Sequence, residues 1–337
     1  MSEPVKADRG GHAAPLRTGL FMVITTVVMF VPPVIAHAAG YPSLAGALVM
    51  PTVAAFLPAL LADTRTSIFA AGMVSAGSAA AVAVSGNSIL AGLTMAAVAF
   101  ITGLGCHWGR SKNLMIVPIT VGFVICLPPN AASDRATDAL LVGAASLAAA
   151  LWGTLAGSLL GRRSPKAPHK PEVWVRTLWY AAVLAILTGV AAGISVGISW
   201  GHAGAWFIMT VVLVFQPYLQ DAFQRTWQRG AGTVIGVLLA FLIHLVVPWS
   251  TVELILGEIF LIVSILVIST GKYPYWFFTS LITPAIVLLA GSAGNFMATD
   301  GARLLATFAG VGLAFVAELL LAPLYRARAK KHHLERF

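Results

Sequence analysis

Two arginines one helical turn apart are the residues of this chain best suited to binding an anion. Arg225 and Arg229 lie in residues 224–236, Gln-Arg-Thr-Trp-Gln-Arg-Gly-Ala-Gly-Thr-Val-Ile-Gly, where an apolar segment begins. Residues four apart share one face of a helix, and a guanidinium binds a carboxylate through two parallel hydrogen bonds. Lys272 opens a later apolar segment. We expect all three to attract an organic anion; the alternative is that they only anchor their segments at a membrane surface.

Carboxylates inside apolar segments form a second group. Glu258 lies well inside one segment, where an ionised side chain costs about 2.5–3.5 kcal/mol on insertion scales. Asp300 and Arg303 lie three residues apart at the start of the last segment, and Asp138 holds the equivalent place in an earlier one. We expect Glu258, Asp300 and Asp138 to couple protons and Arg303 to bind the anion at an outer gate. The alternative is structural: a protonated or paired Glu258, and an interfacial ion pair between Asp300 and Arg303.

Two other titratable residues lie in apolar segments. Glu318 is close to the end of the last segment, so we expect it to pair with a basic residue of the tail. His244 is expected either to relay protons or to make a hydrogen bond within the packed interior.

Small residues mark the places where helices approach each other closely. Gly232 and Gly236 form a pair with three residues between them, a spacing typical of close helix contacts in membranes. Gly72 and Ala76 hold the same spacing earlier in the chain. Gly72, Gly232 and Gly236 are therefore predicted to be helix-packing residues.

Several kinds of catalytic motif are absent from the sequence. The nearest match to a phosphate-binding loop, Gly271-Lys272, has Leu266 where the first glycine belongs. The sequence contains no Cys/His cluster at metal spacing and no pattern that pairs a nucleophile with a base. We therefore expect no cofactor, no metal and no enzymatic activity.

The elements that must position these residues are membrane-spanning helices. The 337 residues are 58% hydrophobic and only 10% charged, too few charges to cover a soluble surface. The net charge of +9 comes from bases at segment ends, which indicates topology rather than nucleic-acid binding. We expect an all-α integral membrane protein that crosses the bilayer about twelve times, with each span about 20 residues long. The expected spans are 17–38, 42–62, 66–85, 88–107, 112–128, 138–160, 176–198, 203–219, 229–248, 251–270, 274–292 and 301–323.

The chain repeats its own landmarks about 160 residues later. The segments Leu16-Arg17-Thr18, Arg65-Thr66 and Ala136-Thr137-Asp138 recur in order as Val175-Arg176-Thr177, Arg225-Thr226 and Ala298-Thr299-Asp300. We predict a first repeat at 1–161, a cytoplasmic linker at 162–174 and a second repeat at 175–337. Six spans in each repeat give both the same orientation. This places all but two of the 21 Lys and Arg residues, and both termini, on the cytoplasmic side.

The second repeat resembles the fusaric acid resistance family. The resemblance is carried by residues 224–236, by the aromatic run at 272–284 that ends in Thr-Pro, and by the acid, arginine and proline-ended tail of 300–323. It implies a bacterial inner-membrane exporter of aromatic carboxylic acids, and it leaves open a homodimer and a periplasmic adaptor as partners. Such exporters usually carry a large soluble region between their membrane halves, whereas this chain has a short proline-rich linker.

The sequence therefore predicts an exporter of organic anions, driven by the proton gradient because no nucleotide site is visible. Two alternatives stay open. One is a passive anion channel, and the other is a membrane subunit or lipid-handling scaffold that transports nothing.

Overall fold

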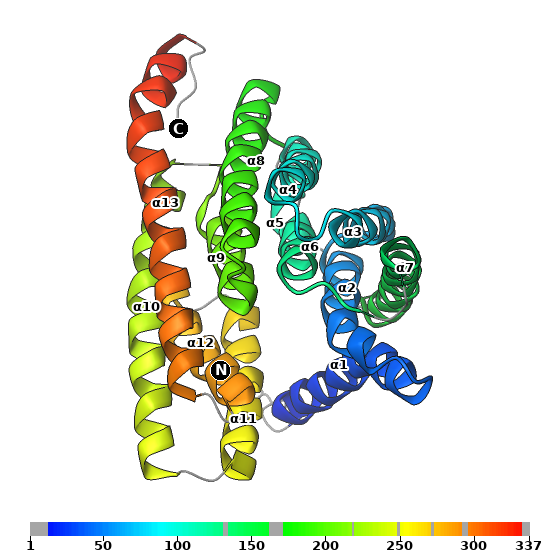
Figure 1. The fold of residues 1–337 in the computed structure, drawn as a ribbon. Coiled ribbons are helices and arrows are strands. Elements are labelled where there is room, and N and C mark those ends of the chain that lie inside the picture. The colour runs from blue at the N-terminus through cyan, green and yellow to red at the C-terminus, as the bar shows by residue number, and fades with distance from the viewer. Residues whose placement is uncertain are drawn as a thin grey trace, which may run out of the picture.

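The structure is a computed structural model that describes residues 13–130, 134–161, 171–217, 219–247, 250–270, 273–291 and 296–331. All regular secondary structure in these ranges is helical (Figure 1). Lys272 and most of the predicted linker lie outside the described residues, and so do the side chains of Glu258 and Asp300.

The helices of the first half follow one another with short connections. They are α1 (Ala13–Ala38), α2 (Pro42–Leu61), α3 (Thr64–Ala83), α4 (Ser88–Gly103), the 3-10 helix η1 (Leu104–Trp108), α5 (Ser111–Leu114), α6 (Ile116–Cys126) and α7 (Arg135–Leu160). Side chains cap three of them: Asp63 accepts from Thr66 N at 2.8 Å, Asn87 from Leu90 N at 3.0 Å, and Asp134 from Thr137 N at 2.9 Å. Each cap satisfies a backbone N–H that the helix leaves unpaired.

The helices of the second half are longer on average. They are α8 (Trp174–Gly197), α9 (Gly201–Val214), α10 (Leu219–Val246), α11 (Ser250–Thr270), α12 (Tyr275–Gly291) and α13 (Phe296–Lys331). Every segment that the sequence marks as a span overlaps a helix of the structure.

Seven helices in the described residues are long and apolar enough to cross a membrane. They are Pro42–Leu61, Thr64–Ala83, Ser88–Trp108, Arg135–Leu160, Trp174–Gly197, Asp221–Val246 and Gly301–Leu320. Four shorter apolar helices accompany them: Val23–Ala38, Ser111–Cys126, Gly201–Val214 and Tyr275–Leu288. The all-helical class is confirmed, whereas the count of twelve spans and the two-repeat arrangement stay predictions.

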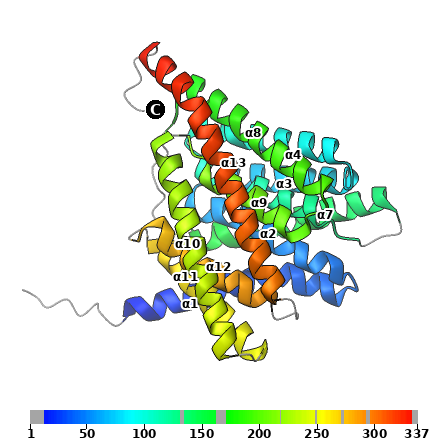
Figure 2. The same cartoon turned by 60° about the vertical axis from the view of Figure 1, so that its left-hand side comes forward.

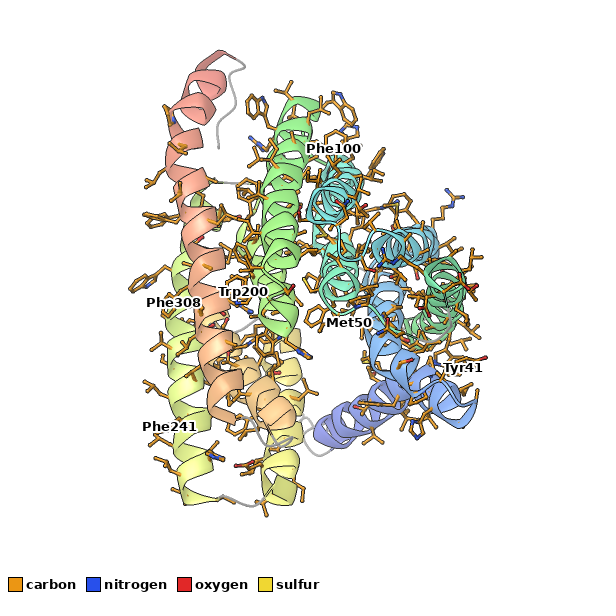
Figure 3. The ribbon with its side chains drawn as sticks, viewed as in Figure 1. Tyr41, Met50, Phe100, Trp200, Phe241 and Phe308 are labelled. Atoms are coloured by element: carbon orange, nitrogen blue, oxygen red, sulfur yellow. The ribbon has the colours of Figure 1, made fainter. Side chains whose placement is uncertain are left out.

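Apolar side chains cover the outer faces of the second half. Leu238, Leu242 and Leu245 of α10 are exposed, and Phe308 projects outward from α13 (Figure 3). Polar and charged side chains of the same helices, including Arg229 and Arg303, are buried. This distribution is the opposite of a soluble protein's and is typical of a helix bundle surrounded by lipid.

Helix pairs that the predicted repeat would make equivalent lie together in both halves of the chain. In the first half α7 packs against α2 and α3, and in the second half α13 packs against α9 and α10. The group α2, α3 and α7 lies on the opposite side of the molecule from α10 and α13 (Figures 1 and 2). The halves meet where α4 packs against α8, and glycine there allows close contact: a Cβ at Gly92 would lie 2.9 Å from the Gly189 carbonyl oxygen.

Candidate functional site

A polar cavity of about 390 Å³ opens beside the first turns of α10 and α12. Its lining includes Arg225 and, around it, the side chains of Gln224, Gln228 and Asp221. The first half contributes Lys112 of α5, so the cavity lies between the two halves. The remaining lining residues are Gln216, Val267, Tyr273, Tyr275 and Phe278.

Tyr275 connects this cavity to the protein interior. The guanidinium carbon of Arg225 lies 5.1 Å from the centre of the Tyr275 ring, a distance at which a cation is attracted to the ring face. Arg229 Nη1 lies 3.4 Å from the Tyr275 hydroxyl oxygen and donates to it. The predicted spacing of Arg225 and Arg229 on one helix face therefore places both against the same aromatic side chain.

Arg229 and Arg303 form a buried arginine pair. Their exposed fractions are 1% and 0%. The guanidinium carbon of Arg303 lies 5.0 Å from the centre of the Trp206 ring of α9, and Arg303 interacts electrostatically with both Arg229 and Tyr275. Two like charges thus share one low-dielectric region, where each raises the free energy of burying the other.

Within the described part of the chain, these two guanidinium groups lack a counter-charge. Nε and Nη2 of Arg229 have no hydrogen-bond partner there, and neither has any of the three guanidinium nitrogens of Arg303. Arg303 was expected in an outer gate or an interfacial ion pair; the structure places its guanidinium wholly inside the protein, against Trp206, while the side chain of its expected partner Asp300 lies outside the described residues. Because buried charges are normally paired, these two guanidinium groups are candidates for binding an anion.

Threonine hydroxyls without partners accompany the buried arginine pair. Thr233 follows Arg229 by one helical turn on α10, and Thr307 follows Arg303 by one turn on α13. Thr210 stands in the same relation to Trp206 on α9. The hydroxyl oxygens of all three are buried and have no hydrogen-bond partner among the described residues. A hydroxyl can donate to a carboxylate oxygen, so these groups fit the same ligand as the arginines.

Glycines hold α10 against α12 and so place Arg229 beside Tyr275. A Cβ at Gly232 would lie 2.7 Å from Thr279 Cβ, and one at Gly236 would lie 2.6 Å from Thr283 Cβ, distances at which one helix would have to move. Gly72 differs from the expectation, because a Cβ there would meet no atom within 4 Å. Its helix, α3, packs against α7 through other residues.

The structure does not bring the predicted proton-coupling residue Asp138 to the arginines. Asp138 is buried in the first turn of α7, which packs against α1, α2 and α3 rather than against the helices of the site. A second cavity of about 410 Å³, lined by Met50, Phe123 and His202 among others, carries no Lys, Arg, Asp or Glu among its described lining residues. This second cavity therefore offers no described Lys or Arg side chain to an anion.

Two contacts between helices differ from what the sequence predicts for single residues. Glu318 was expected to pair with the basic tail, but one of its oxygens lies 3.1 Å from the Thr226 hydroxyl of α10. His244 Nδ1 lies 2.5 Å from Glu253 of α11. Both contacts join different helices, so spacing along one helix gives no signal for them; the turn-spaced threonines beside Arg229 and Arg303 are the signal that was available.

Comparison with known proteins gives a partial match. The profile of the family described as fusaric acid resistance protein-like matches residues 184–317. An uncharacterised protein designated ORF2 from Neisseria gonorrhoeae is 31% identical over 123 residues, which are 36% of this chain and 29% of that protein's length. No solved structure matches the chain. The predicted resemblance is thus confirmed over residues 184–317, and this fusaric acid resistance protein-like region holds Arg225, Arg229, Tyr275 and Arg303.

Proposed function

We propose that this chain exports organic anions, with aromatic carboxylates as the substrate class, across a bacterial inner membrane and with both termini in the cytoplasm. The observation that carries the proposal is the buried arginine pair, Arg229 and Arg303, which the described residues leave without a counter-charge. The coarser conclusion, a membrane transporter, has additional support from the family match and the apolar helices.

An anion between the two guanidinium groups offsets their mutual repulsion and the cost of their burial. An unpaired buried charge costs several kcal/mol, and a charge-assisted hydrogen bond recovers about 1.5–3 kcal/mol. A neutral solute provides neither gain, so the site selects for negative charge. The threonine hydroxyls beside the arginines add donors that fit the second carboxylate oxygen.

Aromatic side chains support an aromatic acid as the ligand. Tyr275 lies between Arg225 and Arg229, and Trp206 lies against Arg303. Phe278 lies in the cavity lining and is 5.8 Å from the Tyr275 ring, centre to centre. A substrate ring can stack in an offset or edge-to-face arrangement on such a group, while its carboxylate reaches the guanidinium groups.

The geometry supports a two-step entry of the anion. Arg225, on the cavity wall, attracts the carboxylate first, and the amides of Gln224 and Gln228 offer neutral hydrogen-bond donors at the same place. Rotation of the Tyr275 side chain breaks its 3.4 Å contact with Arg229 and opens that guanidinium to the anion. The internal repeat remains part of the proposal, and the equivalent packing of α7 and α13 supports it.

The test is flux through the full chain in proteoliposomes, with benzoate as the probe and a neutral amide of the same shape, benzamide, as the comparison. We expect saturable benzoate flux, no benzamide flux, and a loss of about tenfold or more in Arg229→Gln and in Arg303→Gln. Arg110→Gln is the matched control, because Arg110 pairs with Asp63 at 3.0 Å and its side chain is 32% exposed.

The results discriminate among the candidate functions. Equal flux of benzoate and benzamide, or unchanged flux in both variants of the buried arginine pair, contradicts the anion site. Unsaturable benzoate flux favours a passive channel, and absence of any flux favours a scaffold.

A further inference from the structure

Glu318 is a buried acid that faces the helix of the anion site. It lies on α13 with 3% of its surface exposed, and its Oε1 is 3.1 Å from the hydroxyl oxygen of Thr226 on α10. Its second oxygen, Oε2, has no hydrogen-bond partner among the described residues. The carboxyl group thus makes one polar contact where an ionised carboxylate would need several.

The two contacts of the Thr226 hydroxyl are compatible with a protonated acid. The Thr226 hydroxyl oxygen also lies 2.9 Å from the Ala222 carbonyl oxygen, within its own helix. The hydroxyl has one hydrogen for two contacts, and a carbonyl oxygen has none to give. If the Thr226 hydroxyl donates to Ala222, the hydrogen of the second contact comes from Glu318. A protonated, neutral Glu318 therefore satisfies both contacts.

No described cation forms an ion pair with Glu318. The helices packed on α13 are α8, α9, α10 and α12. None of the titratable side chains described on these helices or on α13 makes a hydrogen bond or ion pair with Glu318, whose one polar contact is Thr226. These titratable residues are Arg176, Tyr180, His202, Asp221, Arg225, Arg229, His244, Tyr275 and Arg303. The side chains of Asp300 and of the basic tail lie outside the described residues.

We propose that Glu318 is the proton-binding residue that sets the affinity of the buried arginine pair for its anion. Thr226, its partner, lies on α10 between Arg225 of the cavity wall and Arg229 of the interior. When the Glu318 carboxyl loses its proton to water, the Thr226 hydroxyl must turn its hydrogen from Ala222 to the new carboxylate. The Glu318 carboxylate then repels the substrate anion at Arg229, which lies about one helical turn from Thr226 on α10.

The sign of this linkage follows from the charges. A proton on Glu318 and an anion on the buried arginine pair favour each other's binding, because the proton removes a competing negative charge. This sign differs from the sequence prediction of export driven by the proton gradient, because a site with higher affinity at lower pH binds the anion more tightly on the more acidic side of the membrane. This inference rests on the proposed anion site and names the residue through which pH acts on it.

The experiment measures benzoate binding to the purified full chain in nanodiscs by calorimetry, from about pH 6 to about pH 9, where benzoate stays ionised. We expect the affinity of the unchanged protein to fall roughly tenfold as pH rises, because the ionised Glu318 repels the bound anion. Glu318→Gln keeps the high affinity across the range, because its amide can donate to Thr226 as the acid does. Glu318→Asp restores a pH dependence.

Glu253→Gln is the matched control, because Glu253 is an equally buried acid that has a partner, His244. We expect this variant to keep the pH dependence of benzoate binding. Infrared difference spectra supply a readout that needs no ligand: a protonated carboxyl band at about pH 6 that Glu318→Gln lacks.

The outcomes separate this inference from the proposed function. Benzoate binding that is insensitive to pH in the unchanged protein, or equally sensitive in Glu318→Gln, overturns the role of Glu318 and leaves the anion site standing. Absence of benzoate binding at every pH overturns both. A carboxyl band that is the same with and without Glu318 overturns the inference regardless of affinity.

Discussion

Replacing Arg303 by methionine should stabilise the protein without ligand and abolish its stabilisation by an anion. The side chain lies wholly inside the protein and contacts the Trp206 ring, and its three guanidinium nitrogens have no described hydrogen-bond partner. Methionine is unbranched and adaptable, so it can fill most of the same space and still contact the ring. The change therefore removes the charge and leaves most of the packing.

The magnitude follows from two opposing terms. Holding an arginine inside a membrane helix costs about 2.5–3.5 kcal/mol on insertion scales. A desolvated cation over a tryptophan ring returns about 2 kcal/mol. The difference is about 1 kcal/mol, so we expect Arg303→Met to melt roughly 2 °C higher than the unchanged protein in the absence of ligand.

The assay is thermal unfolding in detergent with and without benzoate. At a benzoate concentration of about 100 times Kd, the unchanged protein gains about 2.7 kcal/mol and melts roughly 5 °C higher. Arg303→Met should show no such shift, whereas Arg110→Met should keep it, because Arg110 lies in a half-buried ion pair with Asp63, away from the buried arginine pair. If Arg303→Met melts several degrees lower than the unchanged protein, or if benzoate still stabilises it, the guanidinium has a structural partner and the reasoning is wrong.

Two further predictions concern packing and capping. Gly236→Ala should lower the melting temperature and the benzoate affinity together, because its Cβ would lie 2.6 Å from Thr283 Cβ. Gly72→Ala should leave both quantities unchanged in the same assays, because a Cβ at Gly72 meets no atom within 4 Å. Equal effects of the two changes would contradict the predicted role of the α10–α12 contact. Hydrogen bonds from Thr137 lower the pKa of Asp134. The cap therefore stabilises the folded protein at pH values above the ordinary pKa of an aspartate, and this stabilisation is lost as pH falls through the lowered pKa. Asp134→Ala should therefore reduce the melting temperature at neutral pH but not at about pH 2, and a pH-independent difference would refute the capping role.

The sequence predicts the helices well because apolar length alone specifies a membrane helix. It predicts their ends less well where polar turns continue the helix. Helix α10 begins at Leu219, ahead of the expected start at 229, because the residues before Arg229 are helical and line the cavity. The expected span 112–128 contains two helices, α5 and α6, which meet at Met115.

The site was predictable to the extent that it lies along single helices. Arg225 and Arg229 share a face by spacing, and the structure places both on Tyr275. The position of Arg303 depends instead on how α13 packs against α9, and its nearest sequence neighbour of opposite charge, Asp300, pointed to a local ion pair. Glu318 meets Thr226 across two helices for the same reason. Tertiary packing, which the periodicity of one helix does not encode, decides these contacts.

The predicted repeat has a consequence for the number of sites, because its two copies share landmarks and packing but not charge. In the register that aligns Arg65 with Arg225, the position of Arg229 is held by Phe69, which is 44% exposed. In the register that aligns Asp138 with Asp300, Leu141 replaces Arg303 and Ala156 replaces Glu318. On the predicted repeat, we therefore expect the proposed anion site to occur once per chain, inside the second half. The first half packs against the second through the α4–α8 contact and adds Lys112 to the cavity lining, so on the proposed function we expect it to support the anion site rather than to hold a second one.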